Sequence, residues 1–203
     1  MSIYVDMLNQ HILEERIMRE KKIFIIRHGE AKGNDLDCPL TSEGIKQVEN
    51  MVVSLIQTEE IKECKIISSE YQRAVETAEI FAKHLDLDFC KDPRLNEINV
   101  GSIKENFKEE LKKRFECVNS KFEGEGGESI HQVMERTHQV IRDIINENNK
   151  NNYILVTHRI TAVLLLHYFD KQFGFDKAWE LTSPDAYLIK ISDGRFKVEH
   201  MKL

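Results

Sequence analysis

The sequence has few of the features that mark secreted or metal-binding proteins. Among its 203 residues are four cysteines, Cys38, Cys64, Cys90 and Cys117, which are widely spaced and form no CxxC pair. This spacing is not that of a zinc site and does not indicate a secreted disulfide framework. We therefore expect buried or half-buried free thiols in a reducing compartment.

Long apolar runs are also missing. The longest cover residues 23–26 and 162–166, whereas a helix needs about 20 apolar residues to cross a bilayer. Asp6, Glu14 and Glu15 interrupt the segment where a signal peptide would need continuous apolar residues. We expect a cytoplasmic protein that has no membrane partner.

Positive charge is not in excess, since 29 lysines and arginines face 35 aspartates and glutamates, for a formal net charge of -6. This balance argues against nucleic acid as a partner. A phosphorylated substrate would have to be held by cations gathered at one place, because the field of the whole protein does not attract anions. The length and the 41% hydrophobic content fit one globular domain.

Strand and helix patterns alternate from Lys22 onward, with no internal repeat or low-complexity segment. Short continuous apolar runs are typical of strands covered on both faces, and apolar residues three to four positions apart are typical of helices. The motif Ser129-Ile130-His131-Gln132 has the form of a capping box. We expect strands at 23–26, 65–68 and 153–156, and helices near 42–57, 70–85, 107–115, 130–144 and 160–169.

Asp193-Gly194 lies between the runs 186–191 and 196–201, which is a strong hairpin signal. The predicted fold is an α/β three-layer sandwich, with a mostly parallel central sheet flanked by helices and an antiparallel hairpin near the C-terminus. Residues 1–20 are expected to form a helical N-terminal extension, and residues 21–203 the domain itself.

Polar residues of the same kind follow three of the predicted strands. The first strand ends in Arg27-His28-Gly29-Glu30, the second in Ser68-Ser69-Glu70 with Arg73 one helical turn later, and the third in Thr157-His158-Arg159. Ligands of open α/β sheets bind beyond the carboxyl ends of the strands. Two histidines and at least two arginines should therefore converge at one edge of the sheet.

This set of side chains suits phosphoryl transfer, whose catalysis consists mostly of positioning and electrostatic stabilisation. An arginine presents a planar fork to two phosphate oxygens. A neutral imidazole can attack phosphorus, and neighbouring guanidinium groups favour its neutral form. Each piece alone is weak, because an Arg-His pair after a strand is usually a surface or capping feature and a histidine at a strand end is more often structural.

The order of these motifs resembles that of the histidine phosphatase superfamily, which includes the cofactor-dependent phosphoglycerate mutases, over about residues 22–200. The resemblance is carried by Arg27-His28-Gly29-Glu30 with Asn34, Leu40-Thr41-Ser42-Glu43-Gly44, Ser68-Ser69 with Arg73-Ala74 and Thr77-Ala78, Arg94-Leu95-Asn96-Glu97, Gly127-Glu128-Ser129, and Thr157-His158.

The resemblance implies a nucleophilic His28 that forms a phosphohistidine, and Gly29 would allow tight backbone packing behind its imidazole. It also implies that neither a metal nor a cofactor is needed, since positive side chains compensate the charge. The phosphoryl oxygens would be held by Arg27, Arg73, His158 and the neutral donor Asn34.

The resemblance gives Glu97 the role of the acid that protonates the leaving oxygen and then deprotonates water. Read from the residues alone, Glu97 could equally be a solvated loop carboxylate or a partner of Arg94. Glu30 is a second candidate carboxylate, better suited to orienting its neighbours. Glu128 is better explained as a helix-start charge interacting with the dipole.

Two departures from the family pattern affect the substrate. Arg159 stands where the family has glycine or another small residue, and it could contact phosphate, fill part of the site or point to solvent. Ile98-Asn99-Val100 stands where the mutases have Arg-His-Tyr, which helps to grip phosphoglycerate.

We therefore predict a metal-independent phosphohydrolase that acts on a small phosphorylated metabolite through a phosphohistidine. A true mutase is the alternative enzyme. A protein that binds a phosphorylated ligand without turning it over is the alternative from another class, and the intact set of His28, Arg73, Glu97 and His158 argues against it.

Overall fold

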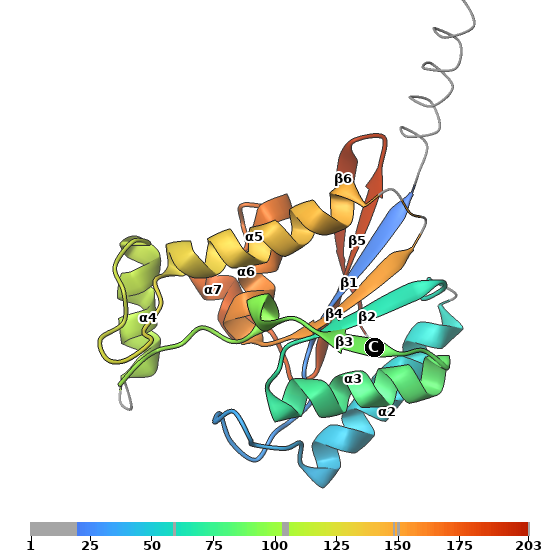
Figure 1. Cartoon of the computed structure of the whole chain (residues 1–203), viewed down its shortest axis with the longest axis horizontal. Helices are drawn as coiled ribbons and strands as arrows, with labels where there is room; N and C mark the ends of the chain where they lie inside the picture. Colours follow the sequence, from blue (N-terminus) through green and yellow to red (C-terminus); the bar gives the residue numbers. More distant parts are fainter. Residues whose placement is uncertain (1–19, 59, 103–105, 148, 150, 203) are drawn as a thin grey trace, which may run out of the picture.

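The computed structural model describes residues 20–58, 60–102, 106–147, 149 and 151–202, so all but the last residue of the expected helical extension over residues 1–20 lies outside it. Figure 1 shows the described elements in sequence colours. In chain order they are β1 (Lys21–Arg27), α2 (Ser42–Gln57), β2 (Cys64–Ser68), α3 (Gln72–Leu85), β3 (Phe89–Lys91), the 3-10 helix η1 (Pro93–Leu95), α4 (Phe107–Glu116), α5 (Ile130–Asn146), β4 (Asn152–Thr157), α6 (Arg159–Phe169), α7 (Phe175–Glu180), β5 (Asp185–Ser192) and β6 (Arg195–His200).

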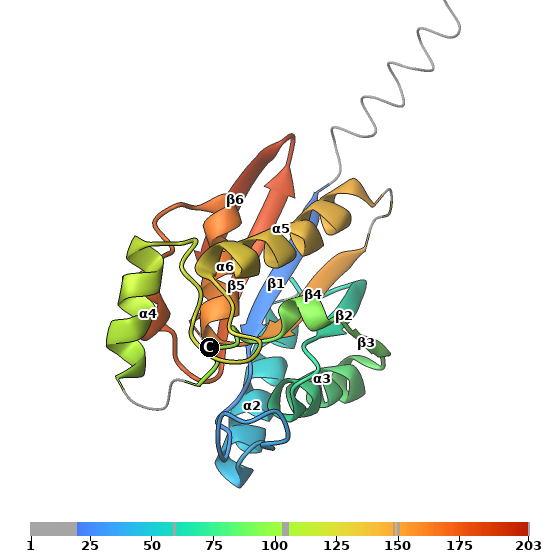
Figure 2. The same cartoon turned by 60° about the vertical axis from the view of Figure 1, so that its left-hand side comes forward.

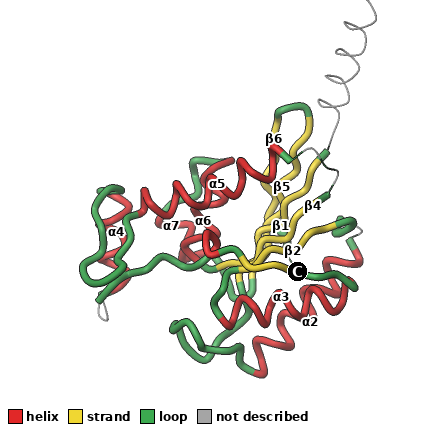
Figure 3. The backbone as a smooth tube through the Cα atoms, viewed as in Figure 1, coloured by secondary structure: helices red, strands yellow, loops and turns green. Residues whose placement is uncertain are grey.

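The strands form one mixed sheet in the order β3-β2-β4-β1-β5-β6, drawn in yellow in Figure 3. The pairs β3–β2, β2–β4 and β4–β1 are parallel, whereas β5 runs antiparallel to β1 and β6 antiparallel to β5. Asp193 and Gly194 both have positive φ, 51° and 70°, as a tight hairpin turn requires. The predicted α/β sandwich with its C-terminal hairpin is confirmed.

Helices cover both faces of the sheet, with α2 and α3 on one side and α5 and α6 on the other (Figures 1 and 2). The central strand β1 serves both layers because successive side chains point to opposite faces. Phe24 and Ile26 pack in the cluster with α2 and α3, whereas Ile23 and Ile25 belong to the cluster with α5 and α6.

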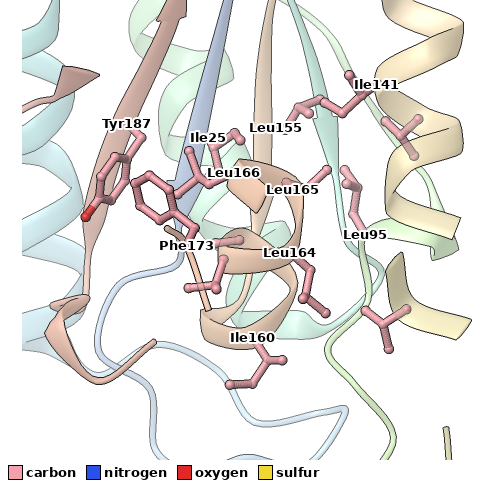
Figure 4. Close-up of a cluster of buried hydrophobic side chains, with 14 of the residues drawn as sticks. Ile25, Leu95, Ile141, Leu155, Ile160, Leu164, Leu165, Leu166, Phe173 and Tyr187 are labelled. Carbon is pink, nitrogen blue, oxygen red and sulfur yellow. The ribbon is translucent and has the colours of Figure 1, made fainter. Parts of the chain in front are cut away.

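Figure 4 shows the second of these clusters, in which Ile25 and Leu155 of the sheet meet Leu165 of α6. Burying each such side chain stabilises the fold by about 1.5–3 kcal/mol. The apolar run of β1 is therefore a consequence of burial on two faces.

Local signals in the sequence match the observed helix starts. The Ser129 side chain accepts from the backbone N–H of Gln132, and the Gln132 side chain accepts from the N–H of Ser129, which completes the predicted capping box of α5. The apolar face of α2 is narrower than its pattern suggested, because Ile45 and Ile56 are 39% and 41% exposed.

The four cysteines are free, but only two of them fit the expected burial. Cys64 is buried and Cys38 is half-buried, whereas Cys90 and Cys117 are exposed. The expectation is wrong for the exposed pair because Cys90 lies in the short edge strand β3 and Cys117 at the end of α4.

No helix within the described ranges is long and apolar enough to cross a membrane. The apolar helix α6 has 11 residues, and most of them are buried against the sheet.

The strand register brings the polar strand ends together. Arg27 at the end of β1 pairs with Thr157 at the end of β4, and Ser68 at the end of β2 pairs with Val156. Since β5 is antiparallel to β1, it begins at this same edge, where Asp185 pairs with Arg27. The predicted site residues therefore share one edge of the sheet with the segment that leads into β5.

Candidate active site

His28 follows β1 and is 8% exposed. Its Nδ1 lies 2.6 Å from the Gly29 carbonyl oxygen, which can only accept, so the neutral ring carries its proton on Nδ1. Its Nε2 lies 3.1 Å from Arg73 Nε and accepts from that guanidinium. The lone pair of the imidazole is therefore on Nε2.

The backbone beside His28 is packed too closely for a side chain. A Cβ at Gly29 would lie 2.7 Å from both the Gly44 carbonyl oxygen and Val48 Cγ2, and one at Gly44 would lie 2.0 Å from the Glu30 carbonyl oxygen. Glycine at both positions lets the first turn of α2 approach the loop after β1. This contact fixes the carbonyl that orients the imidazole.

Arg73, in the first turn of α3, is 3% exposed and is held from the far side. Its Nη1 donates to the carbonyl oxygens of Asn34 and Asp35, at 3.0 and 2.8 Å, while Nε faces His28. The ring of Tyr71 lies 4.9 Å from the guanidinium carbon. These contacts orient a cation toward Nε2 of His28.

Arg27 reaches toward the segment before β5. Its Nη1 donates to the carbonyl oxygens of Leu181 and Thr182, at 2.8 and 2.7 Å. Its Nε is buried and has no hydrogen-bond partner among the described residues. In the same segment, the Ser183 hydroxyl donates to the His28 carbonyl oxygen at 2.8 Å.

His158 is completely buried, and its ring packs edge-on against His28 at a centroid distance of 5.0 Å. Its Nε2 lies 2.8 Å from the Ser69 hydroxyl. That hydroxyl has one proton, which it gives to Asn96 Oδ1 at 2.8 Å. Asn96 Oδ1 is identified as an acceptor because it also takes the backbone N–H of Glu70.

The Ser69 oxygen must therefore accept from His158, so His158 carries a proton on Nε2. Its Nδ1 is buried without a hydrogen-bond partner among the described residues. A chain of hydrogen bonds from Asn96 through Ser69 thus determines the tautomer of His158.

The Glu97 carboxylate lies at the N-terminus of α6. Oε1 accepts from the backbone N–H groups of Ile98 and Thr161, whereas Oε2 accepts only the N–H of Ile160. The Thr161 hydroxyl also lies 3.1 Å from Oε1, but its proton is shared with the nearer Asn96 carbonyl oxygen at 2.8 Å. Oε2 is the oxygen with room for a proton or a further partner. Glu97 is not the partner of Arg94, which binds Asp92 and Asp143.

The other candidate residues lie further from the imidazoles or have other partners. The Asn34 side chain is exposed, and only its backbone carbonyl contacts Arg73. Glu30 accepts from the Thr41 hydroxyl, and Glu128 pairs with Arg136. These contacts fit orienting or structural roles for both carboxylates.

Arg159 does not point freely to solvent. Its guanidinium lies over the ring of Trp179 at 5.0 Å, and its Nε is buried without a hydrogen-bond partner among the described residues. It is near enough to the site to lower the pKa of Arg27 and of His28.

Burial and positive charge both keep the imidazoles neutral. The pKa of His28 is lowered to about 3, chiefly by burial and in addition by the charges of Arg73, Arg27 and Arg159. Burial also lowers the pKa of His158 well below its ordinary value, with His28 and Arg73 adding to the effect. Desolvation, followed by Arg159, lowers the pKa of Arg27 to about 10, so this arginine remains charged at neutral pH.

The site therefore combines cations with buried polar atoms that lack partners in the part of the chain that the structure describes. Within the same ranges, no group of three or more His, Cys, Asp or Glu side chains gathers at metal-binding distance. Unpaired buried donors are costly unless a ligand satisfies them, so this arrangement suits an anion. The independence from metal stays a prediction.

Sequence reasoning missed several residues that hold the site. Ser69 and Asn96 lie in motifs that carry the family resemblance but have no role predicted from it, and Ser183 lies in none of these motifs. Arg136 also supports the segment that carries Glu97, since its Nη1 donates to the carbonyl oxygens of Arg94 and Asn96. The signal that could have pointed to Ser69 is its place directly after the predicted strand 65–68, which matches the places of the two histidines after their strands.

Comparison with known proteins gives a consistent result. A family model described as the histidine phosphatase superfamily (branch 1) matches residues 23–203. The probable phosphoglycerate mutase GpmB of Escherichia fergusonii is 31% identical over 159 residues, which cover 71% of this chain and 73% of that protein. The protein of the same name from Salmonella paratyphi C is 29% identical over the same coverage.

Solved structures share the fold at lower identity. A phosphoglycerate mutase from Bacillus anthracis str. Sterne superposes with a TM-score of 0.71 at 18% identity, over 92% of this chain and 95% of that one. A putative alpha-ribazole-5'-P phosphatase from Escherichia coli str. K-12 gives a TM-score of 0.69 at 20% identity, over 89% and 95% of the two chains. At these identities the likeness shows the fold alone.

Proposed function

Since this chain belongs to the histidine phosphatase superfamily (branch 1), we propose that it is a phosphohydrolase that acts on a small phosphorylated metabolite through a phosphohistidine at His28. The observation that carries the proposal is the state of the His28 ring. Its proton is held on Nδ1 by the Gly29 carbonyl, and its Nε2 lone pair faces a buried guanidinium. This is the arrangement that a nitrogen nucleophile for phosphorus needs.

In the first step, His28 Nε2 forms a bond to phosphorus while the ester P–O bond breaks. Before this bond forms, Arg73 Nε must release the Nε2 lone pair and donate to a phosphoryl oxygen instead. Arg27 supplies further donors to the equatorial oxygens, and Asn34 can add a neutral donor from its exposed loop. The Nε2–H of His158 can reach these oxygens only by turning from the Ser69 hydroxyl. Positive groups fixed in advance stabilise the charge that develops on these oxygens.

Glu97 acts on the leaving group. A proton on Oε2 passes to the departing alkoxide, so that the product leaves as an alcohol. Water then attacks phosphorus, Oε2 takes its proton, and the P–N bond breaks to release phosphate and restore His28. The backbone N–H groups of Ile98 and Thr161 hold Oε1, and with it the carboxylate, in one orientation during both steps.

A phosphoglycerate mutase is the second candidate, and the name of the curated relatives favours it. A mutase must retain the dephosphorylated intermediate and exclude water. The segment after Glu97 does not supply a grip on a carboxylate, since Ile98 is buried, Val100 packs against the core and Asn99 carries no charge. This observation supports hydrolysis.

The two candidates are separated by following both products with the purified protein. We expect phosphate release from simple phosphomonoesters and negligible conversion of 3- to 2-phosphoglycerate in an enolase-coupled assay, even after priming with the bisphosphate. Mutase turnover that exceeds phosphate release would overturn the hydrolase proposal. Tight phosphate binding without either activity would favour a non-catalytic binding protein.

A further inference from the structure

The guanidinium of Arg27 is held by the turn that leads into β5, residues 181–184, which we call the β5 turn. Arg27 Nη1 donates to the carbonyl oxygens of Leu181 and Thr182, at 2.8 and 2.7 Å. Within the described ranges these oxygens are its only hydrogen-bond acceptors, so Nε and Nη2 remain for a ligand. A shift of the turn would move the cation that the proposed mechanism places on the phosphoryl group.

The β5 turn is closed by the carboxylate of Asp185, which is 4% exposed. Its Oδ2 accepts from the backbone N–H of Thr182 at 3.1 Å, and its Oδ1 accepts from the N–H of Ala186 at 2.9 Å. The Thr182 hydroxyl donates in turn to the Pro184 carbonyl oxygen at 2.8 Å. One of the two residues whose carbonyl oxygens hold Arg27 is thus itself held by Asp185.

Asp185 lies directly opposite Arg27 in the antiparallel pair of β5 and β1, so the two side chains share one face of the sheet. A carboxylate in that position would ordinarily pair with the guanidinium through charge-assisted hydrogen bonds. Although the structure describes both side chains, no ion pair joins them. Burial lowers the pKa of Arg27, and the field of the Asp185 carboxylate opposes this lowering.

A third donor to Asp185 is His200, at the end of the edge strand β6. His200 Nε2 lies 2.7 Å from Asp185 Oδ1, and because this oxygen also takes the N–H of Ala186, the imidazole is the donor. The His200 ring stacks on Tyr187 at a centroid distance of 4.5 Å and an angle of 15°. Its side chain is 42% exposed, so a surface residue completes the hydrogen bonds of a buried carboxylate.

From these contacts we infer that Asp185 and His200 are positioning residues for Arg27. With donors from Thr182, Ala186 and His200, the carboxylate holds the β5 turn and is kept from turning onto the guanidinium. The charge of Arg27 is thereby left for the phosphoryl group of the substrate. The inference rests on the proposed function for that contact, and it extends the site to the last strand of the sheet.

Two variants of His200 separate its hydrogen bond from its stacking. His200→Phe keeps the ring that stacks on Tyr187 and removes the donor, whereas His200→Gln loses the ring and offers an amide N–H in place of Nε2. Titration with inorganic phosphate measures the site without turnover. We expect the affinity of His200→Phe to fall about 3- to 10-fold, the effect of one buried hydrogen bond. That of His200→Gln should stay within about twofold of the wild type, since its donor is restored.

A role of His200 in packing alone predicts the opposite order. His200→Phe would then bind phosphate like the wild type, and His200→Gln would bind it less tightly. That order, equal losses in both variants, or no loss in either would overturn the inference.

Lys197→Met in the same strand is the matched control. The Lys197 side chain is 75% exposed and pairs with Glu199, away from the β5 turn. Its replacement should leave phosphate binding unchanged. A loss equal to that of His200→Phe would assign the effect to the hairpin as a whole and contradict the inference.

A second background tests whether the effect passes through Arg27. Arg27→Met should itself weaken phosphate binding. Adding His200→Phe should then change the affinity by less than about twofold, because residues that act as one unit are not additive. An undiminished effect of His200→Phe, or phosphate binding by Arg27→Met as tight as that of the wild type, would contradict this route.

Turnover separates this inference from the proposed function. In phosphate release from a simple ester, His200→Phe should lower kcat/KM by at least the factor that it costs in phosphate affinity. Hydrolysis and phosphate binding that are both unchanged in His200→Phe would refute the positioning role alone. Phosphate binding that depends on His200 in a protein that hydrolyses no ester would refute the hydrolase and leave the positioning role supported.

Discussion

The imidazole of His28 is buried in its neutral form, and this has a cost that depends on pH. Its pKa is about 3 in the folded protein, whereas an unfolded histidine titrates near 6.5. Between these values the unfolded chain binds more protons, so stability falls as the pH is lowered.

We predict that the wild type loses about 2 kcal/mol more stability between pH 7 and pH 5 than His28→Asn does, which is the linkage expected for this shift. Urea denaturation of both proteins at the two pH values measures the difference. His158 shifts in the same direction but is present in both proteins, so it cancels. Parallel pH dependences would mean that His28 titrates normally when folded.

Ser69 holds His158 in one tautomer, because its hydroxyl oxygen accepts a hydrogen bond from Nε2 of that ring. Ser69→Ala removes that acceptor and the link to Asn96. Loss of one buried hydrogen bond, about 0.5–1.5 kcal/mol, should lower kcat/KM for phosphate release by about 3- to 10-fold. The pH dependence should also change, because His158 is then free to take the other tautomer.

Ser68→Ala is the matched control for this variant. Ser68 is equally buried, but its hydroxyl donates to the Ser69 carbonyl oxygen and not to a histidine. If both variants lose activity equally and keep the wild-type pH profile, Ser69 supports the fold only.

The role of Glu97 can be tested through the leaving group. Glu97→Gln should slow esters with poor leaving groups by about 10²–10⁴, the usual range for acid–base assistance. An activated aryl phosphate should suffer much less because its leaving group needs little protonation. Rates of both substrates with the same enzyme preparation provide the comparison.

Equal losses on both substrates would instead assign Glu97 to the start of α6. The substituted amide cannot accept from both Ile160 and Thr161, so a purely structural role predicts damage that does not depend on the leaving group.

At the scale of elements, α5 both packs the core and supports the catalytic edge. Its capping box fixes its start at Ser129, and its Arg136 holds the carbonyls of the segment that carries Glu97. The stability of the helix start is therefore linked to the position of that carboxylate.

We expect Ser129→Ala to cost about 1 kcal/mol of unfolding free energy, whereas Ser129→Gly should cost only about a few tenths, as is usual at such a cap. Thermal or urea unfolding distinguishes the two. If glycine is as damaging as alanine, the contribution of Ser129 comes from its buried environment and not from the cap.

The strands that could be predicted from the sequence share one strong local pattern, a continuous run of apolar residues. The strands β1, β2 and β4 have apolar runs because they are covered on both faces, and their parallel register made the clustering of His28, Arg73 and His158 predictable. The short elements were missed: β3 has three residues at the sheet edge, and α7 has six.

Contacts that depend on the return of the chain could not be predicted either. Ser183 reaches His28 because β5 runs antiparallel to β1, and Arg159 lies on Trp179 because α7 folds back against α6. Neither contact leaves a local pattern in the sequence, because the two residues that each contact joins are far apart along the chain.

In the proposed mechanism, the side chains of the whole molecule supply all the positive charge, and no metal ion takes part. Activity should therefore survive exhaustive treatment with a chelator, since in that mechanism the charge of the phosphoryl group is compensated by Arg27 and Arg73. Phosphate release before and after chelation is the measurement. Loss of activity that returns with magnesium or zinc would identify the histidines as metal ligands.

The central claim is that the phosphoryl group passes through His28, and trapping the intermediate tests it most directly. The enzyme is mixed with a phosphomonoester labelled in the phosphoryl group, quenched without acid, and the labelled peptide is identified. We expect a label that is labile in acid and stable in alkali, located on His28 and absent from His28→Ala. Label on an aspartate or serine, or undiminished phosphate release by His28→Ala, would contradict it.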